Sequence, residues 1–449
     1  MARVPMRAED ALFLHAQTPL LCQQVGAVLL LESAAIRPGD FRVAMGHRVQ
    51  RAPGLRRRLE RPATRWRRPC WVTDDDTDFR DRIQHVTLGR DGCPATLADV
   101  IDGFFSQPCD PFHNPWQMML VRGLVTGRTA VVVKVHHTVG DSTAIIAMLS
   151  ELFDPGPVRA PAAGAVSNRS GPPRRRIPGR RAARAVRGLW HLATAGQAPE
   201  LSVCGTFTSD RRHYLPVGLP AREVAVTARR LRVGIADLLL TLITEALSQL
   251  LRARGEETLG RTVRVAVPRS GAGLTARSRR PPANRSAALS LDLPIGPLTL
   301  AERLAAVRGQ LGAHEHRGEA EAAALVLRAL NYLPQPLQRR AARQLYQHRW
   351  FNLLVSVFPG QRRSHRLLGA RVAEVYPVLA LADGVGLAIG AMTWETSLSI
   401  GILADARLVT DAGRLAAELA AAFRRAQAAA SGGALAVGGP SQEAPAAIV

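Results

Sequence analysis

The pattern of apolar and polar positions predicts strands and helices in two parts of the chain. In the first part, short valine- and leucine-rich runs predict strands over 25–32, 118–124 and 129–137, followed by a helix over 141–153. In the second part, a long apolar period predicts a helix over 234–255, and a helical pair falls within 301–349. The strands predicted there are 262–268, 287–295, 351–358, 386–392 and 398–405. Strands mixed with helices in both parts indicate an α/β protein built in layers.

A change of composition separates the two parts. The segment 155–190 is rich in proline, glycine and arginine without a sustained apolar period, which predicts a basic linker or crossover. We therefore divide the chain into a first half over 1–154 and a second half over 191–426. The alanine- and glycine-rich residues 427–449 predict a disordered tail. With 449 residues, 47% of them hydrophobic, the chain can bury two cores of domain size.

The formal net charge of +23 raises the question of an anionic partner. Almost all of the basic residues are arginines, and Lys134 is the only lysine. We find no RRM, zinc-finger or helix-turn-helix signature and expect no nucleic-acid partner. Anionic lipid surfaces, or the phosphates of a nucleotide-like cosubstrate, remain as partners for the arginines.

Cysteine usage and hydropathy indicate the compartment. The five cysteines are odd in number, scattered and without a C-x-x-C pair, so we expect neither a disulfide framework nor a structural zinc site. Glu9 and Asp10 interrupt the region where a signal peptide would be apolar, and no apolar run reaches about 18 residues. These features predict a cytoplasmic protein that does not span a membrane.

The stretch "VVVKVHHTVGDSTAII" over 131–146 carries the candidate chemistry. Side chains alternate in a strand, so His137 shares a face with the odd-numbered valines, whereas His136 shares the other face with Lys134. The two imidazoles cannot both reach one ligand, and we predict no metal site there. One histidine is expected to face a cleft as a general base, and the other to face the interior as a hydrogen-bonded group.

The residues after the histidines allow two interpretations. Asp141 is expected at the start of the next helix, where a carboxylate favours the helix dipole and can pair with an arginine. "GDSTA" over 140–144 is also similar to the G-x-S-x-G nucleophile elbow of serine hydrolases. However, Ser142 follows His137 by five positions, whereas an elbow serine stands at the strand's end. A serine hydrolase therefore stays an alternative, which a fluorophosphonate probe would distinguish.

Beyond these local patterns, "HHTVGDS" resembles the HHxxxDG motif of the coenzyme A-dependent acyltransferase superfamily. More of the chain resembles one branch, the bacterial wax ester synthase/diacylglycerol acyltransferases. The segments that carry this likeness lie in the same order over 7–32, 106–137, 233–255, 371–392 and 398–411. Together they cover most of the chain outside the linker and the tail.

The resemblance implies two similar mixed-sheet α/β halves of the coenzyme A-dependent acyltransferase type, with a cleft or tunnel between them. It implies fatty acyl transfer from acyl-CoA to diacylglycerol, giving triacylglycerol, or to a long-chain alcohol, giving a wax ester. His137 would be the general base without an acyl-enzyme intermediate, and His136 and Asp141 would be structural supports. Acyl-CoA would be a cosubstrate, with no further cofactor and no metal. The lipid acceptor implies peripheral association with the inner membrane or lipid droplets.

Several positions depart from the family pattern. Ser142 replaces the motif's final glycine, Ala236 replaces the asparagine of an Asn-Asp pair, and Val357 replaces an asparagine in "SVFPGQ". Gln117 stands where the family has an acidic residue. By analogy with the family, substrate binding is expected at Ser142, Asp237 and Asn284. Two further alternatives stay open, namely a catalytically impaired lipid-binding relative and an acyltransferase that uses another acceptor.

Overall fold

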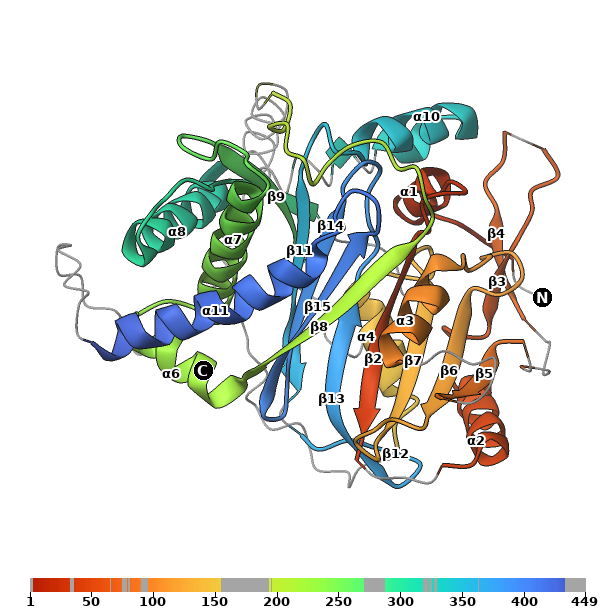
Figure 1. Cartoon of the computed structure of the whole chain (residues 1–449). Coiled ribbons are helices and arrows are strands. Elements are labelled where there is room, and N and C mark those ends of the chain that lie inside the picture. The colour runs from red at the N-terminus through yellow and green to blue at the C-terminus, as the bar shows by residue number, and fades with distance from the viewer. Residues whose placement is uncertain are drawn as a thin grey trace, which may run out of the picture.

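The computed structural model describes residues 3–32, 36–64, 66–74, 79, 81–89, 96–154, 194, 196–269, 287–317, 322, 325–326, 329–361 and 363–432. Two six-stranded sheets form the centre of this part of the chain, and Figure 1 shows them next to each other with helices around them. Each sheet mixes parallel and antiparallel pairs. The predicted α/β class with two mixed-sheet halves is thereby confirmed.

The first sheet has the strand order β12-β13-β2-β7-β6-β5. Its parallel pair is β5 with β6, and its other neighbours run antiparallel. All residues of β7 are buried, because helices cover both faces of the strand. The strands are β2 (Gln24–Leu31), β5 (Ile83–Thr87), β6 (Trp116–Arg122), β7 (Thr129–His136), β12 (Arg366–Leu367) and β13 (Ala370–Val378).

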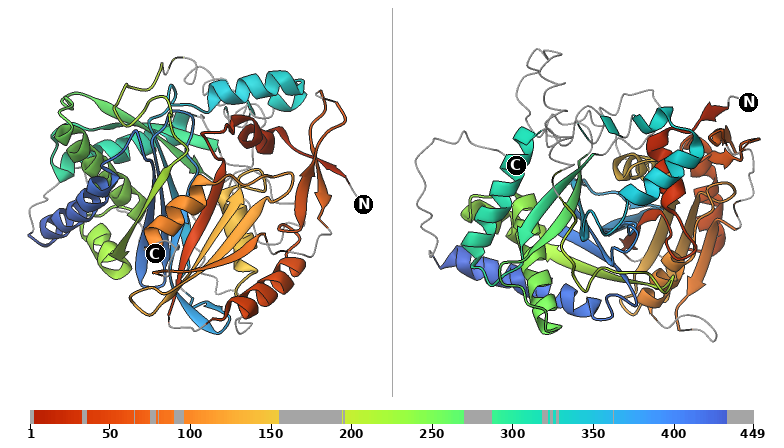
Figure 2. Two further views of the ribbon diagram at one scale, coloured as in Figure 1. Left: turned by 45° about the vertical axis from the view of Figure 1, so that its right-hand side comes forward. Right: turned by 90° about the horizontal axis from the view of Figure 1, so that it is seen from above.

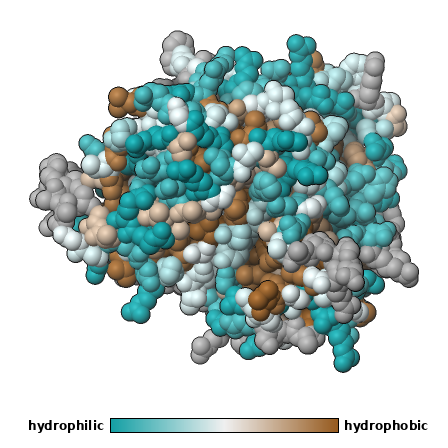
Figure 3. Space-filling model, viewed as in Figure 1, coloured by the Kyte–Doolittle hydropathy of each residue, from teal (hydrophilic) through white to brown (hydrophobic). Residues whose placement is uncertain are grey.

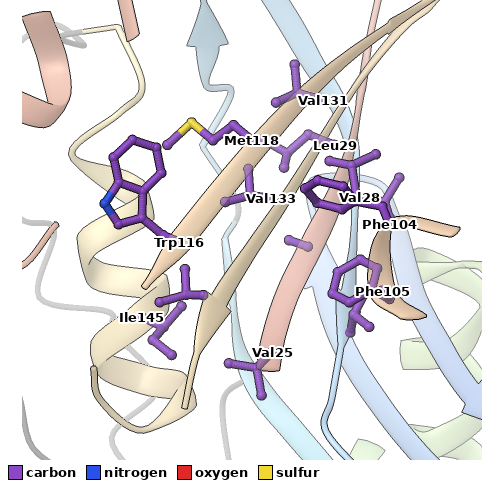
Figure 4. Close-up of a cluster of buried hydrophobic side chains, with 14 of the residues drawn as sticks. Val25, Val28, Leu29, Phe104, Phe105, Trp116, Met118, Val131, Val133 and Ile145 are labelled. Carbon is purple, nitrogen blue, oxygen red and sulfur yellow. The ribbon is translucent and has the colours of Figure 1, made fainter. Parts of the chain in front are cut away.

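Helices α3 and α4 cover opposite faces of this sheet. The Lys134 ammonium group donates to the carbonyl of Phe104 in α3 at 2.6 Å, so α3 lies on the even-numbered face of β7. Figure 4 shows Phe104 and Phe105 on one side of the strands, with Val133 and Ile145 on the other. The helices and the small sheet of this half are α1 (Ala8–Ala16), α2 (Pro38–Arg51), α3 (Leu97–Ser106), α4 (Ser142–Ser150), β1 (Val4–Pro5), β3 (Arg57–Glu60) and β4 (Cys70–Thr73).

The second sheet has the order β10-β9-β11-β14-β15-β8. Its strands are β8 (Arg212–Pro220), β9 (Thr262–Arg269), β10 (Ala287–Pro294), β11 (Leu353–Gln361), β14 (Leu387–Trp394) and β15 (Ser397–Asp405). The helices of the second half are α6 (Ala221–Arg230), α7 (Ile235–Ala253), α8 (Leu300–Arg317), the short η1 (Leu330–Tyr332), α10 (Gln335–Leu345) and α11 (Ala412–Ser431). Figure 2 shows α7, α8 and α11 stacked outside this sheet, where α7 buries most of its leucines.

Strand β13 connects the two sheets. It comes from the second half of the chain, yet it pairs antiparallel with β2 of the first sheet and packs against β14 and β15. Glycine makes this close approach possible, because a Cβ atom at Gly401 would lie 1.9 Å from the Pro377 carbonyl oxygen. The second half, predicted over 191–426, therefore contributes β12 and β13 to the first sheet.

The sequence prediction left out several elements, among them α3, α11, β5, β8 and β13, and it placed the ends of others differently. The helix predicted over 141–153 spans Ser142–Ser150 with Asp141 as its N-cap. Helix α11 buries one apolar side and continues to Ser431. The prediction of a disordered tail from residue 427 is therefore wrong for residues 427–431, which are helical. The predicted linker over 155–190 and residues 433–449 lie outside the described residues.

Helix length and apolarity also bear on membrane crossing. Among the described helices, none alone is long and apolar enough to cross a membrane. Helices α6 and α7 pass that test only when taken together, with a bend of 96° between them.

Candidate active site

The two histidines stand at the end of β7, where the chain turns toward α4. The backbone N–H of His136 donates to Pro115 at 2.7 Å, whereas that of His137 donates to Gln23 at 2.8 Å. Successive residues therefore bond to opposite neighbours, as in a continuing strand. The Val139 N–H closes the turn by donating to the His136 carbonyl at 3.0 Å. The two imidazoles thus point in different directions, as the alternation predicts.

His136 is an interior residue with no exposed surface. Its Nδ1 accepts from the Thr138 backbone N–H at 3.2 Å and contacts the Thr138 hydroxyl at 2.8 Å. The ring proton then belongs on Nε2, which lies 2.6 Å from Oε1 of Gln17. Burial, assisted by the neighbouring His137, lowers the pKa of His136 to about 3. His136 is therefore neutral and serves as a fixed hydrogen-bonded group.

His137 is half-buried and lies against an aromatic cluster. Its ring stacks on Phe13 of α1, with centroids 3.7 Å apart and planes inclined by 8°. Phe13 in turn meets Tyr346, the residue after α10, edge-on at 5.7 Å. Phe13 thus contacts both the imidazole and a segment of the second half. Its role as a general base stays a prediction for His137, with which the partial exposure of the residue is compatible.

Asp141 caps the helix that follows the histidines. It is buried, and its carboxylate accepts from the Ala144 backbone N–H at 2.9 Å. This is an N-cap interaction, which holds the turn between His137 and α4 in place. Ser142 is the first residue of α4, while the strand itself ends at His136. The nucleophile elbow needs its serine at the strand's end, so the geometry does not favour a serine hydrolase.

The other expected substrate-binding residues are not brought to the histidines by the described structure. Asp237 lies in the first turn of α7 and accepts from the Gly234 N–H at 3.3 Å as part of a helix cap. Helix α7 packs mainly on α6, α8 and α11, on the outside of the second sheet. Asn284 lies outside the described residues. Among the departures, Val357 packs into the core of the second half, and Gln117 lies opposite Lys134 in the first sheet.

An apolar cavity lies between the two sheets, on the α4 side of β7. Its free volume is about 60 Å³, and residues from both halves line it. Val131 and Val133 contribute from the same face of β7 that His137 continues. Counting four residues at roughly 3.3 Å each, Val133 lies roughly 13 Å from His137. Other lining side chains include Met118, Ile145, Phe358, Pro377, Met392 and Trp394, of which Figure 4 labels Met118 and Ile145.

Sequence reasoning missed three residues that hold the histidines. These are Phe13, which stacks on His137, Gln17, which contacts His136, and Gln23. Gln23 accepts from the His137 N–H through its backbone and donates through Nε2 to the Leu381 carbonyl at 3.0 Å, which joins the halves. The available signal was the presence of glutamines in an otherwise apolar stretch before the first strand.

Acid is expected to destabilise the fold through two buried histidines. Burial lowers the pKa of His136 to about 3, and burial with nearby arginines lowers that of His15 to about 4. Unfolded histidine titrates near 6.5, so below that pH the unfolded chain binds more protons than the folded protein. The free energy of unfolding therefore has its full value above about pH 6.5. As the pH falls from there toward about pH 4, each histidine lowers it by roughly 1.4 kcal/mol per pH unit. Urea unfolding across this range measures the slope, and an unchanged slope in His136→Gln would refute the assignment.

The described part of the chain has two mixed sheets with an apolar cavity between them, as the resemblance to the coenzyme A-dependent acyltransferases implies. The model of the wax ester synthase/diacylglycerol acyltransferase catalytic domain matches residues 6–294, and that of the WS/DGAT C-terminal domain matches residues 283–427. The chain belongs to this family and is an acyltransferase of the diacylglycerol O-acyltransferase or wax ester synthase type.

Individual proteins agree with this assignment. A probable diacylglycerol O-acyltransferase of Mycobacterium tuberculosis is 26% identical over 411 residues, which cover 87% of this chain and 88% of the relative. The wax ester synthase/diacylglycerol acyltransferase of Marinobacter aquaeolei has a similar structure, with a TM-score of 0.69, 18% identity and coverage of 95% and 99%. The first condensation domain of the calcium-dependent antibiotic synthetase shares the fold at a TM-score of 0.60, with 17% identity and coverage of 96% and 97%.

Proposed function

We propose that this enzyme transfers a fatty acyl group from acyl-CoA to the hydroxyl of diacylglycerol or of a long-chain alcohol, with His137 as the general base. The observation that carries the proposal is the apolar cavity on the His137 face of β7. A base on the same strand face as an apolar space suits a reaction in which the reacting group is polar and the rest of the substrate is hydrocarbon. The names of the relatives point to diacylglycerol and to the alcohol of a wax ester as acceptors.

The reaction proceeds by direct transfer. His137 accepts the acceptor's hydroxyl proton while the oxygen attacks the thioester carbonyl carbon, which forms a tetrahedral oxyanion. As the oxyanion collapses, the C–S bond breaks and the thiolate of CoA leaves. The imidazolium gives its proton to that sulfur, so the products are an ester and free CoA, and His137 is neutral again. No protein atom is acylated.

His136 and Asp141 act by positioning. His136 ties the end of β7 to Gln17 of the first helix region and to Thr138, and it stays neutral beside the base. A neutral neighbour matters, because a second imidazolium would disfavour protonation of His137 during the reaction. Asp141 fixes the start of α4, so the turn that carries His137 has a defined geometry.

The acyl chain is assigned to the cavity between the sheets. Each buried methylene contributes about 0.8 kcal/mol, so an apolar lining favours long chains. The free volume of about 60 Å³ is small, but Met45, Met118 and Met392 line it, and methionine side chains adapt to fill or open irregular space. A long chain would enter as these side chains move.

Filling the cavity is expected to shift the preferred acyl chain length. Ile146 of α4 lines the cavity, and Ile146→Phe adds bulk there. We expect the kcat/KM ratio of hexadecanoyl-CoA to hexanoyl-CoA to fall about tenfold, because only the long chain needs the occupied space. The neighbouring Ala147 is exposed on the same helix, so Ala147→Phe is the matched control and should leave the ratio unchanged. Equal losses for both donors in Ile146→Phe would place the chain elsewhere.

The reaction is also assigned to a lipid surface. Diacylglycerol and long-chain alcohols reside in lipid phases, so an enzyme that acts on them meets them at an interface. The formal net charge of +23 favours anionic surfaces. Peripheral contact with the inner membrane or with lipid droplets follows from these two arguments.

A further inference from the structure

The segment 331–350, which contains α10, exposes an unusual set of side chains. Several large apolar groups are exposed: Tyr332 (89%), Leu337 (53%), Leu345 (40%), Trp350 (39%) and Leu333 (38%). The same segment presents four exposed arginines, Arg339, Arg340, Arg343 and Arg349, and it contains no aspartate or glutamate. Figures 1 and 2 show α10 at the rim of the molecule, and in Figure 3 the corresponding upper edge is mostly hydrophilic with isolated hydrophobic groups.

Helix α10 is inverted relative to an ordinary surface helix. Its buried residues are Gln335, Gln338 and Ala342, whereas Leu337 and Leu345 are exposed. The Gln338 amide donates to the Leu330 and Leu333 carbonyls at 2.8 and 2.7 Å, so polar bonds anchor the helix. A surface helix in water normally buries its leucines and exposes its glutamines. Exposed apolar groups that the fold does not cover mark an interaction surface.

We infer that segment 331–350 docks the enzyme onto an anionic lipid surface. This inference rests on the proposed function. Arginines without neighbouring acidic residues in the segment complement anionic headgroups, and apolar groups among them can enter the headgroup region. Tyrosine and tryptophan favour that depth because their rings are apolar with one polar tip. Trp350 donates through Nε1 to the Gln344 carbonyl at 2.6 Å, which holds its ring at the end of α10.

The docking surface lies next to the base. Helix α10 packs against α1, and Nε of Arg343 donates to the His15 carbonyl at 3.3 Å. Tyr346, which follows α10, contacts Phe13, and Phe13 stacks on His137. Only two ring contacts therefore separate the end of the docking helix from the proposed base.

Vesicle flotation of the full chain tests the inference. Purified protein is mixed with vesicles of phosphatidylcholine alone or with phosphatidylglycerol added, and the bound fraction is measured. We expect the wild-type protein to bind only the vesicles that contain phosphatidylglycerol. The double variant Arg340→Gln/Arg349→Gln should bind these vesicles more weakly, by roughly fivefold for each arginine removed. Tyr332→Ser with Leu337→Ser should weaken binding to the same vesicles about tenfold. Val43→Ser with Leu259→Ser is the control, since both residues are exposed apolar groups in other segments.

The outcomes separate the docking surface from the proposed function. Acyl transfer to a detergent-dispersed acceptor should stay at the wild-type rate in the docking variants, because none of their residues touches the reacting groups. Unchanged vesicle binding in both double variants, or equal loss in the control, overturns the docking inference and leaves the reaction untouched. Self-association that needs no vesicles and disappears in the same variants would also overturn it, in favour of a second copy as the occupant.

Discussion

Replacing His137 with alanine is expected to lower kcat for acyl transfer by about 100-fold or more while the protein stays folded. The reason is that the acceptor hydroxyl then loses its proton acceptor, whereas the cavity for the acyl chain is unchanged. KM for acyl-CoA should change little, because His137 acts on the hydroxyl in the transition state. Initial rates of CoA release with saturating acceptor measure both parameters.

Two controls define this result. His113→Ala removes an exposed histidine that pairs with Asp110, and it should keep the wild-type rate. His137→Gln keeps a polar side chain at the position but not a base of suitable pKa, so it should be as inactive as the alanine variant. A His137→Ala enzyme that retains more than about a tenth of the wild-type kcat would contradict the general-base assignment.

Arg212→Ala is expected to destabilise the protein by roughly 3–5 kcal/mol. Arg212 and Asp405 form a buried ion pair between β8 and β15 at 2.8 Å, with side chains 3% and 0% exposed. The same guanidinium donates to the Leu20 carbonyl of the first half. Its loss leaves the Asp405 charge buried with only backbone N–H donors from Arg407 and Leu408. Urea unfolding measures the loss as a lower midpoint.

The exposed pair between Arg3 and Glu60 gives the comparison. Their side chains are 68% and 37% exposed, so Arg3→Ala should cost less than about 1 kcal/mol. Similar losses in the two variants would mean that burial of the Arg212 pair does not determine its contribution. An Arg212→Ala protein of wild-type stability would show that the contact with Leu20 does not help to join the halves.

The central strands and helix α7 were predictable because their apolar residues indicate the secondary structure without information from the rest of the chain. The valines of β7 and the leucines of α7 form runs that only a buried strand or helix accommodates. Strand β13 was different, since its membership of the first sheet depends on pairing with β2 over 300 positions away and on the glycine at position 401. No local pattern contains that information. Strand β8 was missed because two prolines and a glycine interrupt its apolar residues.

The candidate site was predictable in its division of labour but not in its supports. Side-chain alternation predicted that the two imidazoles face different sides, and the family resemblance supplied the expectation that His136 is the support and His137 the base. Thr138 is a local partner of His136, but Phe13 and Gln17 come from α1 and the residue after it, more than 100 residues earlier, so spacing could not reveal them. Asp237 illustrates the opposite case, because a helix-capping residue and a substrate-binding residue look alike in sequence.

The measurement that tests the central claim most directly is acyl transfer by the purified wild-type enzyme from labelled palmitoyl-CoA, with diacylglycerol and hexadecanol offered separately. We predict labelled triacylglycerol, wax ester or both, with free CoA released in equal amount and no labelled protein. A folded enzyme that forms neither ester, or a protein that carries the label on Ser142, would contradict the account. The first result would favour the lipid-binding relative or another acceptor, and the second would favour the serine nucleophile.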